Sequence, residues 1–280
     1  MKLQFAKMHG VGNDVMVVSW PVGVALPGPA QIRLWADRRL GPGFDQLMLI
    51  DESYSGPADA AYRVFNADGG EVEQCGNGVR CVAQYLAARS DSDTLTLESA
   101  AGIVTAKLLG EGRVTVGLGE PKFSPDALPF VAAEGEASSY ELFVAEQRVE
   151  FGAVSMGNPH AVIDTDSVDD APVGILGGQF QEHDAFPSGV NVGFMEIRDT
   201  GRVGLRVFER GVGETQACGT GAAAAVAVGR DRGRLAERVA VSLPGGELEV
   251  FWQGRGNTLW LSGPTTRVYE GQIDYEPTEG

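Results

Sequence analysis

Hydrophobic and polar residues alternate, or form short apolar runs, along several parts of the chain, as is typical of β-strands with one or both faces buried. The clearest strand patterns lie at 61–66, 113–119, 202–209 and 257–263. Apolar positions with helical spacing are fewer. They lie at 29–39, 76–89, more weakly 174–183, and 219–230. Strands therefore outnumber helices, and the pattern predicts a mixed α/β (α+β) fold.

The segment 219–230, GTGAAAAVAVGR, has no polar face until it ends. A helix that is apolar on all sides is normally buried on all sides. We therefore expect strands to surround this helix.

The length and a proline-rich stretch indicate two domains. The 280 residues, 43% of them hydrophobic, are enough for one large core or two ordinary ones. The segment EPKFSPDALP, 120–129, contains three prolines and is the best candidate for a linker. We place an N-terminal lobe at 1–118 and a C-terminal lobe at 119–264, and expect a strand within 265–280 to return to the first lobe.

A faint internal repeat supports two lobes. Three pairs of segments match in the same order with nearly the same offset: CGNG at 75–78 with CGTG at 218–221 (offset 143, from 218 − 75), MHGVGNDVMVV at 8–18 with SMGNPHAVID at 155–164 (145, from Asn158 and Asn13), and FDQLMLI at 44–50 with VNVGFMEI at 190–197 (145, from Asn191 and Gln46). Each match is short, but their shared order and offset predict two similar α/β lobes. Each lobe then has a Cys-Gly-x-Gly cysteine at the start of its central helix.

A cysteine at a helix start has a specific chemistry. Unpaired backbone N–H groups and the positive end of the helix dipole stabilise a thiolate, and the glycines that follow let a carboxylate approach those N–H groups. Two such helix starts, contributed by Cys75 and Cys218, suit inversion at the carbon next to a carboxylate. One thiolate removes a proton from one face while the opposing thiol donates a proton to the other. No cofactor is required in principle.

The alternative is a purely structural role, in which the cysteine is a small buried hydrophobic residue. Cys81 fits it well, because it lies six residues into the predicted helix in an apolar run. For Cys75 and Cys218 the repeated polar context before the cysteine and Gly-x-Gly after it argue against passive packing. Three widely spaced cysteines are also unlike a disulfide framework, so reduced thiols are expected.

Composition narrows the possible partners. The formal charge of −16 and the lack of a basic run argue against nucleic acid. No window reaches the roughly 18 apolar residues of a membrane span, and the start lacks the apolar segment of a signal peptide. We therefore expect a cytoplasmic protein that binds a small molecule or another protein.

Metal and pyridoxal chemistry are weakly supported. The three histidines, His9, His160 and His183, are far apart and have no zinc-binding spacing. No lysine lies in the glycine-rich phosphate context that a pyridoxal enzyme needs. His160 follows Asn158-Pro159 in a predicted loop, where it is either a turn residue or a group that tunes a nearby thiol.

Five ordered blocks that span nearly the whole chain resemble the diaminopimelate epimerase family: FAKMHGVGND (5–14), NADGGEVEQCGNGVRC (66–81), MGNPHAV (156–162), GVNVGF (189–194) and ERGVGETQACGTG (209–221). The resemblance implies interconversion of LL- and meso-2,6-diaminopimelate in lysine and peptidoglycan-precursor synthesis, by two thiols and without cofactor or metal. It also implies a homodimer of two-lobed chains. Each lobe is a β-rich barrel around a central helix, and the active site is in the cleft between the lobes. Val15 departs from the family, which more often has an aromatic residue there; this affects local packing only.

The resemblance also assigns residues by position. Cys218 matches the proton acceptor and Cys75 the donor in the LL direction, and His160 and Glu209 match residues that modulate the thiols. Arg210 matches the residue expected to hold the distal carboxylate, for which a guanidinium fork is apt. Tyr269 matches a dimer-interface tyrosine. The implied substrate-binding residues are Asn13, Gln46, Asn66, Gly76, Asn77, Asn158, Asn191, Glu209, Arg210, Gly219 and Thr220. For the asparagines the alternative is a turn role.

Two other functions stay open at this point. One is a related racemase acting on another amino acid, such as proline, hydroxyproline, histidine or lysine; Arg210 argues against a monocarboxylate, which would not need it. The other is a noncatalytic or thiol-redox protein in which Cys75 and Cys218 form a switch.

Overall fold

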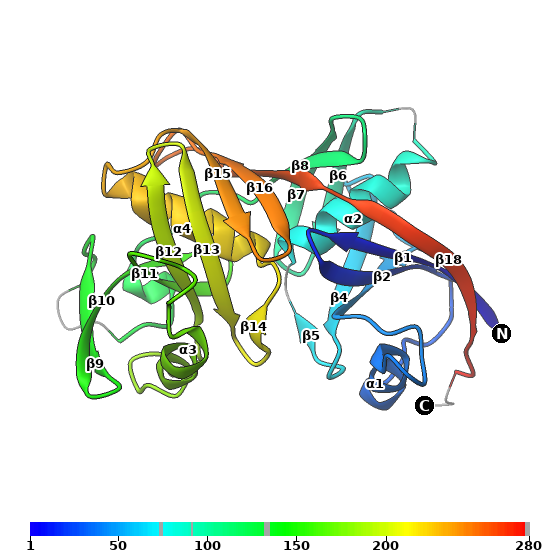
Figure 1. Ribbon diagram of the computed structural model, residues 1–280. Helices are drawn as coiled ribbons and strands as arrows, with labels where there is room; N and C mark the ends of the chain where they lie inside the picture. The colour runs from blue at the N-terminus through cyan, green and yellow to red at the C-terminus, as the bar shows by residue number, and fades with distance from the viewer. Residues whose placement is uncertain (73–74, 91, 132–134, 278–280) are drawn as a thin grey trace. The chain divides into compact units, whose positions relative to one another are not determined.

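The chain folds into two compact units, each rich in strands and each with one long helix packed on its sheet (Figure 1). The computed structural model describes residues 1–72, 75–90, 92–131 and 135–277. The first unit comprises Met1–Val116 and Gly263–Gly280, and the second Gly117–Ser262. Within the described ranges, no helix has both the length and the apolar character needed to cross a membrane.

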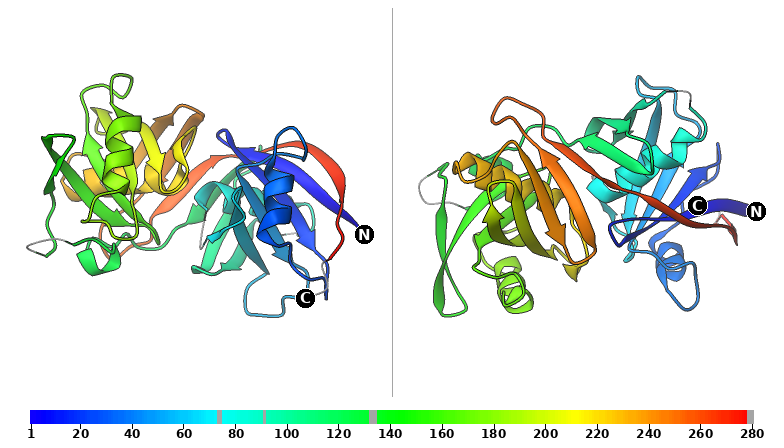
Figure 2. Two further views of the ribbon diagram at one scale, coloured as in Figure 1. Left: turned by 90° about the horizontal axis from the view of Figure 1, so that it is seen from below. Right: turned by 45° about the horizontal axis from the view of Figure 1, so that its top comes forward.

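The first unit contains two helices and a series of short strands among its described residues. In chain order they are β1 (Lys2–Gly10), β2 (Asn13–Trp20), α1 (Pro29–Ala36), β3 (Gln46–Asp51), β4 (Ala60–Asn66), β5 (Glu71–Val72), α2 (Gly76–Ala87), β6 (Thr94–Ser99), β7 (Gly102–Leu108), β8 (Arg113–Gly117) and, near the C-terminus, β18 (Thr266–Asp274). In both views of Figure 2 the red strand β18 runs beside the blue strand β1, and the two pair antiparallel, with Lys2 opposite Asp274.

The second unit has the same kinds of element. They are the short 3-10 helix η1 (Pro125–Ala127), β9 (Tyr140–Val144), β10 (Gln147–Ser155), β11 (Pro159–Asp164), α3 (Val173–Gln181), β12 (Asn191–Asp199), β13 (Arg202–Glu209), β14 (Gly213–Thr215), α4 (Gly219–Asp231), β15 (Arg238–Leu243), β16 (Gly246–Phe251) and β17 (Trp260–Pro264). The predicted helices and strands are confirmed, although β17 begins three residues later than its sequence pattern predicts.

Strand pairing confirms the internal repeat. The parallel pair β2–β3 sets Val15 beside Gln46, and the parallel pair β11–β12 sets His160 beside Asn191, so both partners are shifted by 145. The hairpins β4–β5 and β13–β14 match with an offset of 143, because Phe65 faces Glu71 and Phe208 faces Glu214. The offset changes because the segment 46–66 is two residues longer than the segment 191–209 (66 − 46 against 209 − 191).

The two long helices differ in burial. Every residue of α4 from Gly219 to Gly229 is buried, and the helix contacts β10, β11, β12, β13 and β16 of its own unit. This confirms that its wholly apolar composition reflects burial on all sides. In α2 the side chains from Gly76 to Ala83 are buried, whereas those after them are only partly buried.

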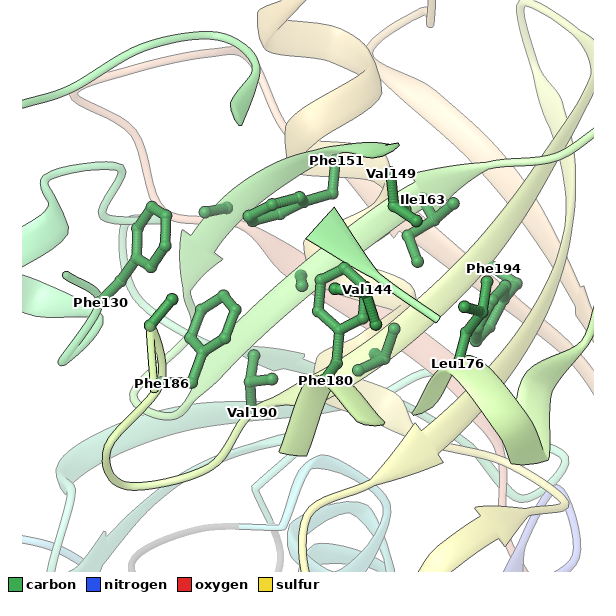
Figure 3. Close-up of a cluster of buried hydrophobic side chains, with 14 of the residues drawn as sticks. Phe130, Val144, Val149, Phe151, Ile163, Leu176, Phe180, Phe186, Val190 and Phe194 are labelled. Carbon is green, nitrogen blue, oxygen red and sulfur yellow. The ribbon is translucent and has the colours of Figure 1, made fainter. Parts of the chain in front are cut away.

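The second unit has a core rich in aromatic side chains (Figure 3). Phe130 stacks on Phe186 with ring centroids 4.8 Å apart, and Phe151 meets Phe180 edge to face at 5.3 Å. The proline-rich segment 120–129 belongs to this packing. Leu128 is buried, and Lys122 forms an isolated bridge with Ser155. The candidate linker 120–129 thus lies just after the boundary between the units, and its Leu128 enters the core of the second unit.

Candidate active site

Cys75 caps the N-terminus of α2. Its backbone is extended, and its Sγ accepts the N–H of Gly78 at 3.2 Å. A Cβ at Gly78 would lie 2.7 Å from the Met48 sulfur, so this position of the Cys-Gly-x-Gly motif has no room for a side chain. The glycine thus lets the helix start lie close to β3 with the thiol at its end.

Polar side chains lie at the first residue of β2, the first of β3 and the last of β4, and one of them contacts this thiol. The Cys75 thiol donates to Asn13 Oδ1 at 3.6 Å. Gln46 Nε2 donates to Asn66 Oδ1 at 3.2 Å, and Gln46 is directly opposite Asn66. Gln46 Oε1 is buried with no hydrogen-bond partner among the described residues, which leaves an acceptor available to a ligand.

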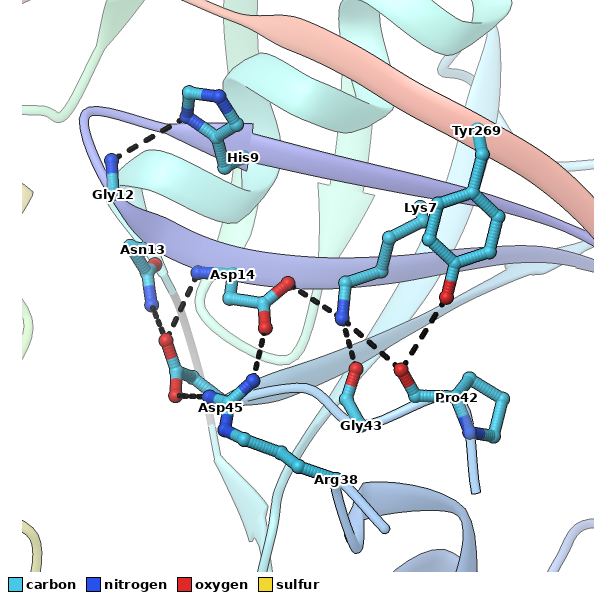
Figure 4. Close-up of polar contacts among 10 residues, drawn as sticks. All are labelled: Lys7, His9, Gly12, Asn13, Asp14, Arg38, Pro42, Gly43, Asp45 and Tyr269. Carbon is cyan, nitrogen blue, oxygen red and sulfur yellow. Dashed lines mark hydrogen bonds and ion pairs between the residues drawn. The ribbon is translucent and has the colours of Figure 1, made fainter. Parts of the chain in front are cut away.

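A charged network supports Asn13 from behind (Figure 4). The Asp45 carboxylate accepts from Asn13 Nδ2 at 3.4 Å and from the backbone N–H of Asp14 at 2.9 Å. Arg38 binds Asp45 at 2.6 Å and also pairs with Asp14. Lys7 reaches the other Asp14 oxygen at 2.7 Å. These contacts fix the turn that carries Asn13.

Arg80 supports the helix start from inside. Its guanidinium is fully buried, and it donates to Asn77 Oδ1 at 2.9 Å and to the carbonyl of Gly76 at 3.1 Å. Burial lowers the pKa of Arg80 to about 10. A buried cation of this kind holds the first turn of α2, at Gly76 and Asn77, in one conformation.

Cys218 repeats the geometry of Cys75 in the second unit. It caps α4 with an extended backbone, and its Sγ accepts the N–H of Gly221 at 3.4 Å. The Thr220 hydroxyl lies 3.6 Å from the same sulfur. Cys218 is only 4% exposed. Among the described residues, none of the three cysteines, including the fully buried Cys81, forms a disulfide.

The electrostatic surroundings of Cys218 favour the thiol. Burial, followed by the charge of Glu209, raises the pKa of Cys218, and these effects outweigh the hydrogen bonds from Thr220 and Gly221. Glu209 itself accepts from the Thr215 hydroxyl at 2.5 Å. The sequence predicts stabilisation of a thiolate by the helix start, and at Cys218 desolvation and a neighbouring carboxylate act in the opposite direction.

His160 lies on β11, not in a loop as its Asn-Pro context predicts. Its Nε2 is 3.0 Å from Asn158 Oδ1, and Asn158 Nδ2 donates to the Thr220 hydroxyl at 3.4 Å. Burial, and then the charge of Arg210, lowers the pKa of His160 to about 3. The imidazole is therefore neutral near pH 7, and the side-chain oxygen of Asn158 requires that Nε2 carry its proton.

Asn191 links the start of β11 to the backbone of Arg210. Its Nδ2 donates to the carbonyl of Pro159 at 2.9 Å, and its Oδ1 accepts the N–H of Arg210 at 3.0 Å. The exposed Arg210 side chain donates from Nη1 to the carbonyl of Ser188 at 3.2 Å. A guanidinium held at one nitrogen can still form a fork with a carboxylate.

The predicted residues fall into two groups, one in each unit, and within each group several of them are joined by hydrogen bonds. The first group is Asn13, Gln46, Asn66, Cys75, Gly76 and Asn77, and the second is Asn158, His160, Asn191, Glu209, Arg210, Cys218, Gly219 and Thr220. Tyr269 belongs to neither group. It is 44% exposed on β18, with its ring edge-on to Phe5 and its hydroxyl 3.4 Å from the carbonyl of Pro42.

Sequence reasoning missed three supporting residues, Asp45, Arg80 and Thr215. A charged residue inside an apolar helical face was the available signal for Arg80; the other two are visible only through their contacts. Among the described residues, no group of three or more His, Cys, Asp or Glu side chains could hold a metal ion.

Several solved structures share this fold. A hydroxyproline epimerase from Agrobacterium vitis matches with a TM-score of 0.72 at 20% identity, covering 97% of this chain and 92% of that one. A probable proline racemase from Agrobacterium radiobacter matches with a TM-score of 0.74 at 19% identity, covering 99% and 94%. At these identities the likeness defines the class of fold, a two-unit α/β fold.

Sequence comparison is more specific. The diaminopimelate epimerase family model matches residues 5–124 and 152–268. Diaminopimelate epimerases from Pseudomonas paraeruginosa and Pseudomonas aeruginosa are each 48% identical over 275 residues, covering 98% of this chain and 99% of theirs. The chain therefore belongs to the diaminopimelate epimerase family.

Proposed function

We propose that this protein interconverts LL- and meso-2,6-diaminopimelate without a cofactor, using Cys75 and Cys218 as its acid and base. The observation that carries the proposal is the repeated cap: each cysteine accepts the N–H of the glycine three residues later, at 3.2 Å and 3.4 Å, at the start of the central helix of its unit. Membership of the diaminopimelate epimerase family supplies the substrate.

In the LL direction, Cys218 removes the α-proton as a thiolate and Cys75 delivers a proton to the opposite face. The Glu209 carboxylate is a hydrogen-bond partner of the Cys218 side chain, so it is placed to accept the thiol proton before the α-proton moves. The positive α-ammonium group of the substrate lowers the cost of forming the thiolate. After one turnover Cys218 is protonated and Cys75 is the thiolate, which is the state that acts on the meso isomer.

Substrate binding follows from the donors at the two helix starts. Backbone N–H groups at Gly76-Asn77 and Gly219-Thr220 suit the carboxylate next to the reacting carbon. We assign the distal carboxylate to Arg210, whose exposed guanidinium supplies the paired donors that a carboxylate accepts. The amide side chains of Asn13, Gln46, Asn66, Asn158 and Asn191 supply the remaining polar contacts.

We further propose that the protein is a cytoplasmic homodimer that serves lysine and peptidoglycan-precursor synthesis. Exposed apolar residues of β18 support the dimer, because Val268 and Tyr269 are 57% and 44% exposed, and exposed apolar surface favours association. Sedimentation of the wild type and of a Tyr269→Lys variant tests it; a monomeric wild type would contradict it.

The test of the activity is purified protein with LL-diaminopimelate, analysed by chiral chromatography without added cofactor. The meso isomer should form, and chelators or carbonyl reagents that trap pyridoxal should leave the rate unchanged. Proline and hydroxyproline in parallel reactions test the related racemases. Turnover of those amino acids, with none of diaminopimelate, would overturn the substrate assignment.

A matched substitution tests the distal subsite. Arg210→Lys keeps the positive charge but loses the guanidinium fork, so KM for diaminopimelate should rise roughly tenfold or more, in line with the strength of a charge-assisted pair. Wild-type kinetics in that variant would remove Arg210 from the site. If both cysteine-to-alanine variants kept full activity with an intact fold, the thiol pair would be structural and the two-thiol mechanism would fail.

A further inference from the structure

Two Arg–Glu pairs repeat with the cysteines. Arg63 on β4 forms a side-on pair with Glu71 on β5, at 2.7 Å and 2.6 Å. Arg206 on β13 pairs in the same way with Glu214 on β14, at 2.7 Å and 3.0 Å. Both arginines and both glutamates are 143 residues apart, the same offset as the two cysteines. Each pair therefore belongs to the repeat that carries a cysteine.

Each pair spans a hairpin that leads into a cysteine. In β13–β14, Phe208 faces Glu214 and Val207 faces Thr215, so Arg206 and Glu214 are diagonal neighbours on one face. Because side chains alternate along a strand, Glu209 and Thr215 lie on the other face, where their hydrogen bond forms. The hairpin thus has an ion pair on one side and the Glu209 carboxylate on the other.

We propose that Arg206–Glu214 and Arg63–Glu71 are positioning pairs that hold these hairpins so that the residues around each cysteine keep their reactive arrangement. In the second unit, Arg206–Glu214 fixes the hairpin that presents Glu209 and Arg210 and then leads to Cys218. In the first unit, Arg63–Glu71 fixes the hairpin that begins at Asn66 and precedes Cys75. The inference rests on the proposed two-thiol function.

The pair in the second unit is the stronger of the two. Arg206 also donates from Nη1 to the carbonyls of Val168, Asp169 and Ala171, at 2.8, 3.4 and 3.4 Å. It therefore ties the hairpin to a neighbouring loop, whereas Arg63 lies over the Phe65 ring at 5.4 Å. The Arg206 side chain is 24% exposed and that of Arg63 is 44% exposed. Less exposure means weaker screening by solvent.

The chain offers a matched control. Arg238 and Glu249 form an ion pair with the same diagonal placement on the β15–β16 hairpin, and no proposed site residue lies on that hairpin. Exposed ion pairs contribute little to stability in general. Because Arg206 also donates to three backbone carbonyls, the closer comparison is Glu214→Gln with Glu249→Gln, since each breaks one diagonal ion pair and leaves the other contacts of the arginine in place. A difference between these two variants would report the position of the pair rather than the loss of a surface charge.

The first experiment compares Arg206→Gln, Glu214→Gln, Arg63→Gln, Arg238→Gln and Glu249→Gln in steady-state turnover. We expect kcat to fall roughly tenfold or more in Arg206→Gln, because small displacements of catalytic groups are costly, with KM and the melting temperature close to those of Arg238→Gln. Glu214→Gln should lose more kcat than Glu249→Gln, and Arg63→Gln should lose less than Arg206→Gln. The double variant Arg206→Gln/Glu214→Gln should be no worse than Arg206→Gln, since both changes remove one interaction. Equal kcat in Glu214→Gln and Glu249→Gln would overturn the inference.

A second measurement does not depend on activity. Alkylation by iodoacetamide, followed by peptide mass mapping, reports the accessibility of each thiol. Cys218 is almost completely buried and Cys81 fully so. Arg206→Gln should speed modification of Cys218 several-fold while Cys81 keeps its wild-type rate. Parallel rises at both cysteines would indicate general loosening and contradict a positioning role. If wild-type protein fails to epimerise diaminopimelate, the proposed function fails, whereas the Cys218 alkylation rates still decide whether the pair holds the hairpin.

Discussion

Asn13 and Asn158 occupy equivalent positions in the two units, yet their amides point in opposite senses. In the first unit the Asn13 oxygen accepts from the Cys75 thiol, and its nitrogen donates away from the thiol to Asp45. In the second, the Asn158 nitrogen donates to Thr220 at the helix start. The backbone repeat therefore provides the same scaffold twice, while the partner of each amide decides which of its atoms points to the helix start.

The partners differ because the two units share a backbone arrangement but have different side chains at equivalent positions. Asp45 corresponds to Val190 and Val15 corresponds to His160, each shifted by 145. The amide of Asn13 is thus held by a carboxylate, whereas the amide of Asn158 is held by a buried neutral imidazole at 3.0 Å. The thiols differ in the same way, because Glu209, which faces Cys218, has Asn66 as its equivalent.

The cysteines themselves should give the largest effect. Cys75→Ala and Cys218→Ala should each lower epimerisation by about a thousandfold, within the range for losing a general acid or base. Deuterium exchange from solvent should separate the two roles. Cys75→Ala, which keeps Cys218, should still exchange the α-hydrogen of the LL isomer, and Cys218→Ala that of the meso isomer. Cys81→Ala is the control and should keep its activity. Exchange of the same isomer in both variants would break the comparison.

The second effect concerns the Glu209 carboxylate beside Cys218. Glu209→Gln should reduce kcat roughly a hundredfold, in the range for general-base groups. Because Glu209 raises the pKa of Cys218, the amide should also move the Cys218 limb of the pH–rate profile to lower pH. Asn66→Asp makes the converse change in the first unit and should move the Cys75 limb to higher pH. A pH profile that stays fixed in Glu209→Gln would show that the carboxylate does not act on the thiol.

The helices and their cysteine caps could be predicted from the sequence, whereas the protonation states around the cysteines could not. Apolar periodicity identified the helices, and α4 was expected to be buried because it lacks a polar face. The Cys-Gly-x-Gly motifs located both caps. The raised pKa of Cys218 and the neutral state of His160 were not predictable, because both depend on desolvation by residues distant in sequence. The pairs Arg63–Glu71 and Arg206–Glu214 are present in the sequence as a repeat with offset 143, but only the strand register shows that each spans a hairpin.

The third effect follows from the neutral state of His160. Its pKa falls from about 6.5 in the unfolded chain to about 3 in the folded protein, so below pH 6.5 the unfolded state binds the extra proton. Stability should therefore fall as the pH drops, by about 1.4 kcal/mol per pH unit. Urea unfolding at pH 7.5 and pH 5 should show that the wild type loses about 2 kcal/mol more than His160→Gln, which cannot titrate. Equal losses in the two proteins would mean that His160 is not buried as a neutral group.

The smallest effect concerns Asp45, which has no polar counterpart in the second unit. Asp45→Asn keeps the shape of the side chain but loses the charged pair with Arg38 and weakens the acceptor for Asn13 Nδ2. A hydrogen bond of this kind contributes about 0.5–1.5 kcal/mol, so kcat/KM should fall by roughly two- to tenfold. It should fall equally in both directions of the reaction, because an enzyme variant cannot change the equilibrium. The matched control is Glu249→Gln, which removes one charge of the Arg238 pair on a hairpin without proposed site residues. A loss in Asp45→Asn no larger than in this control would show that Asn13 keeps its orientation without the carboxylate, and that the two units differ less in how they hold their amides than their contacts indicate.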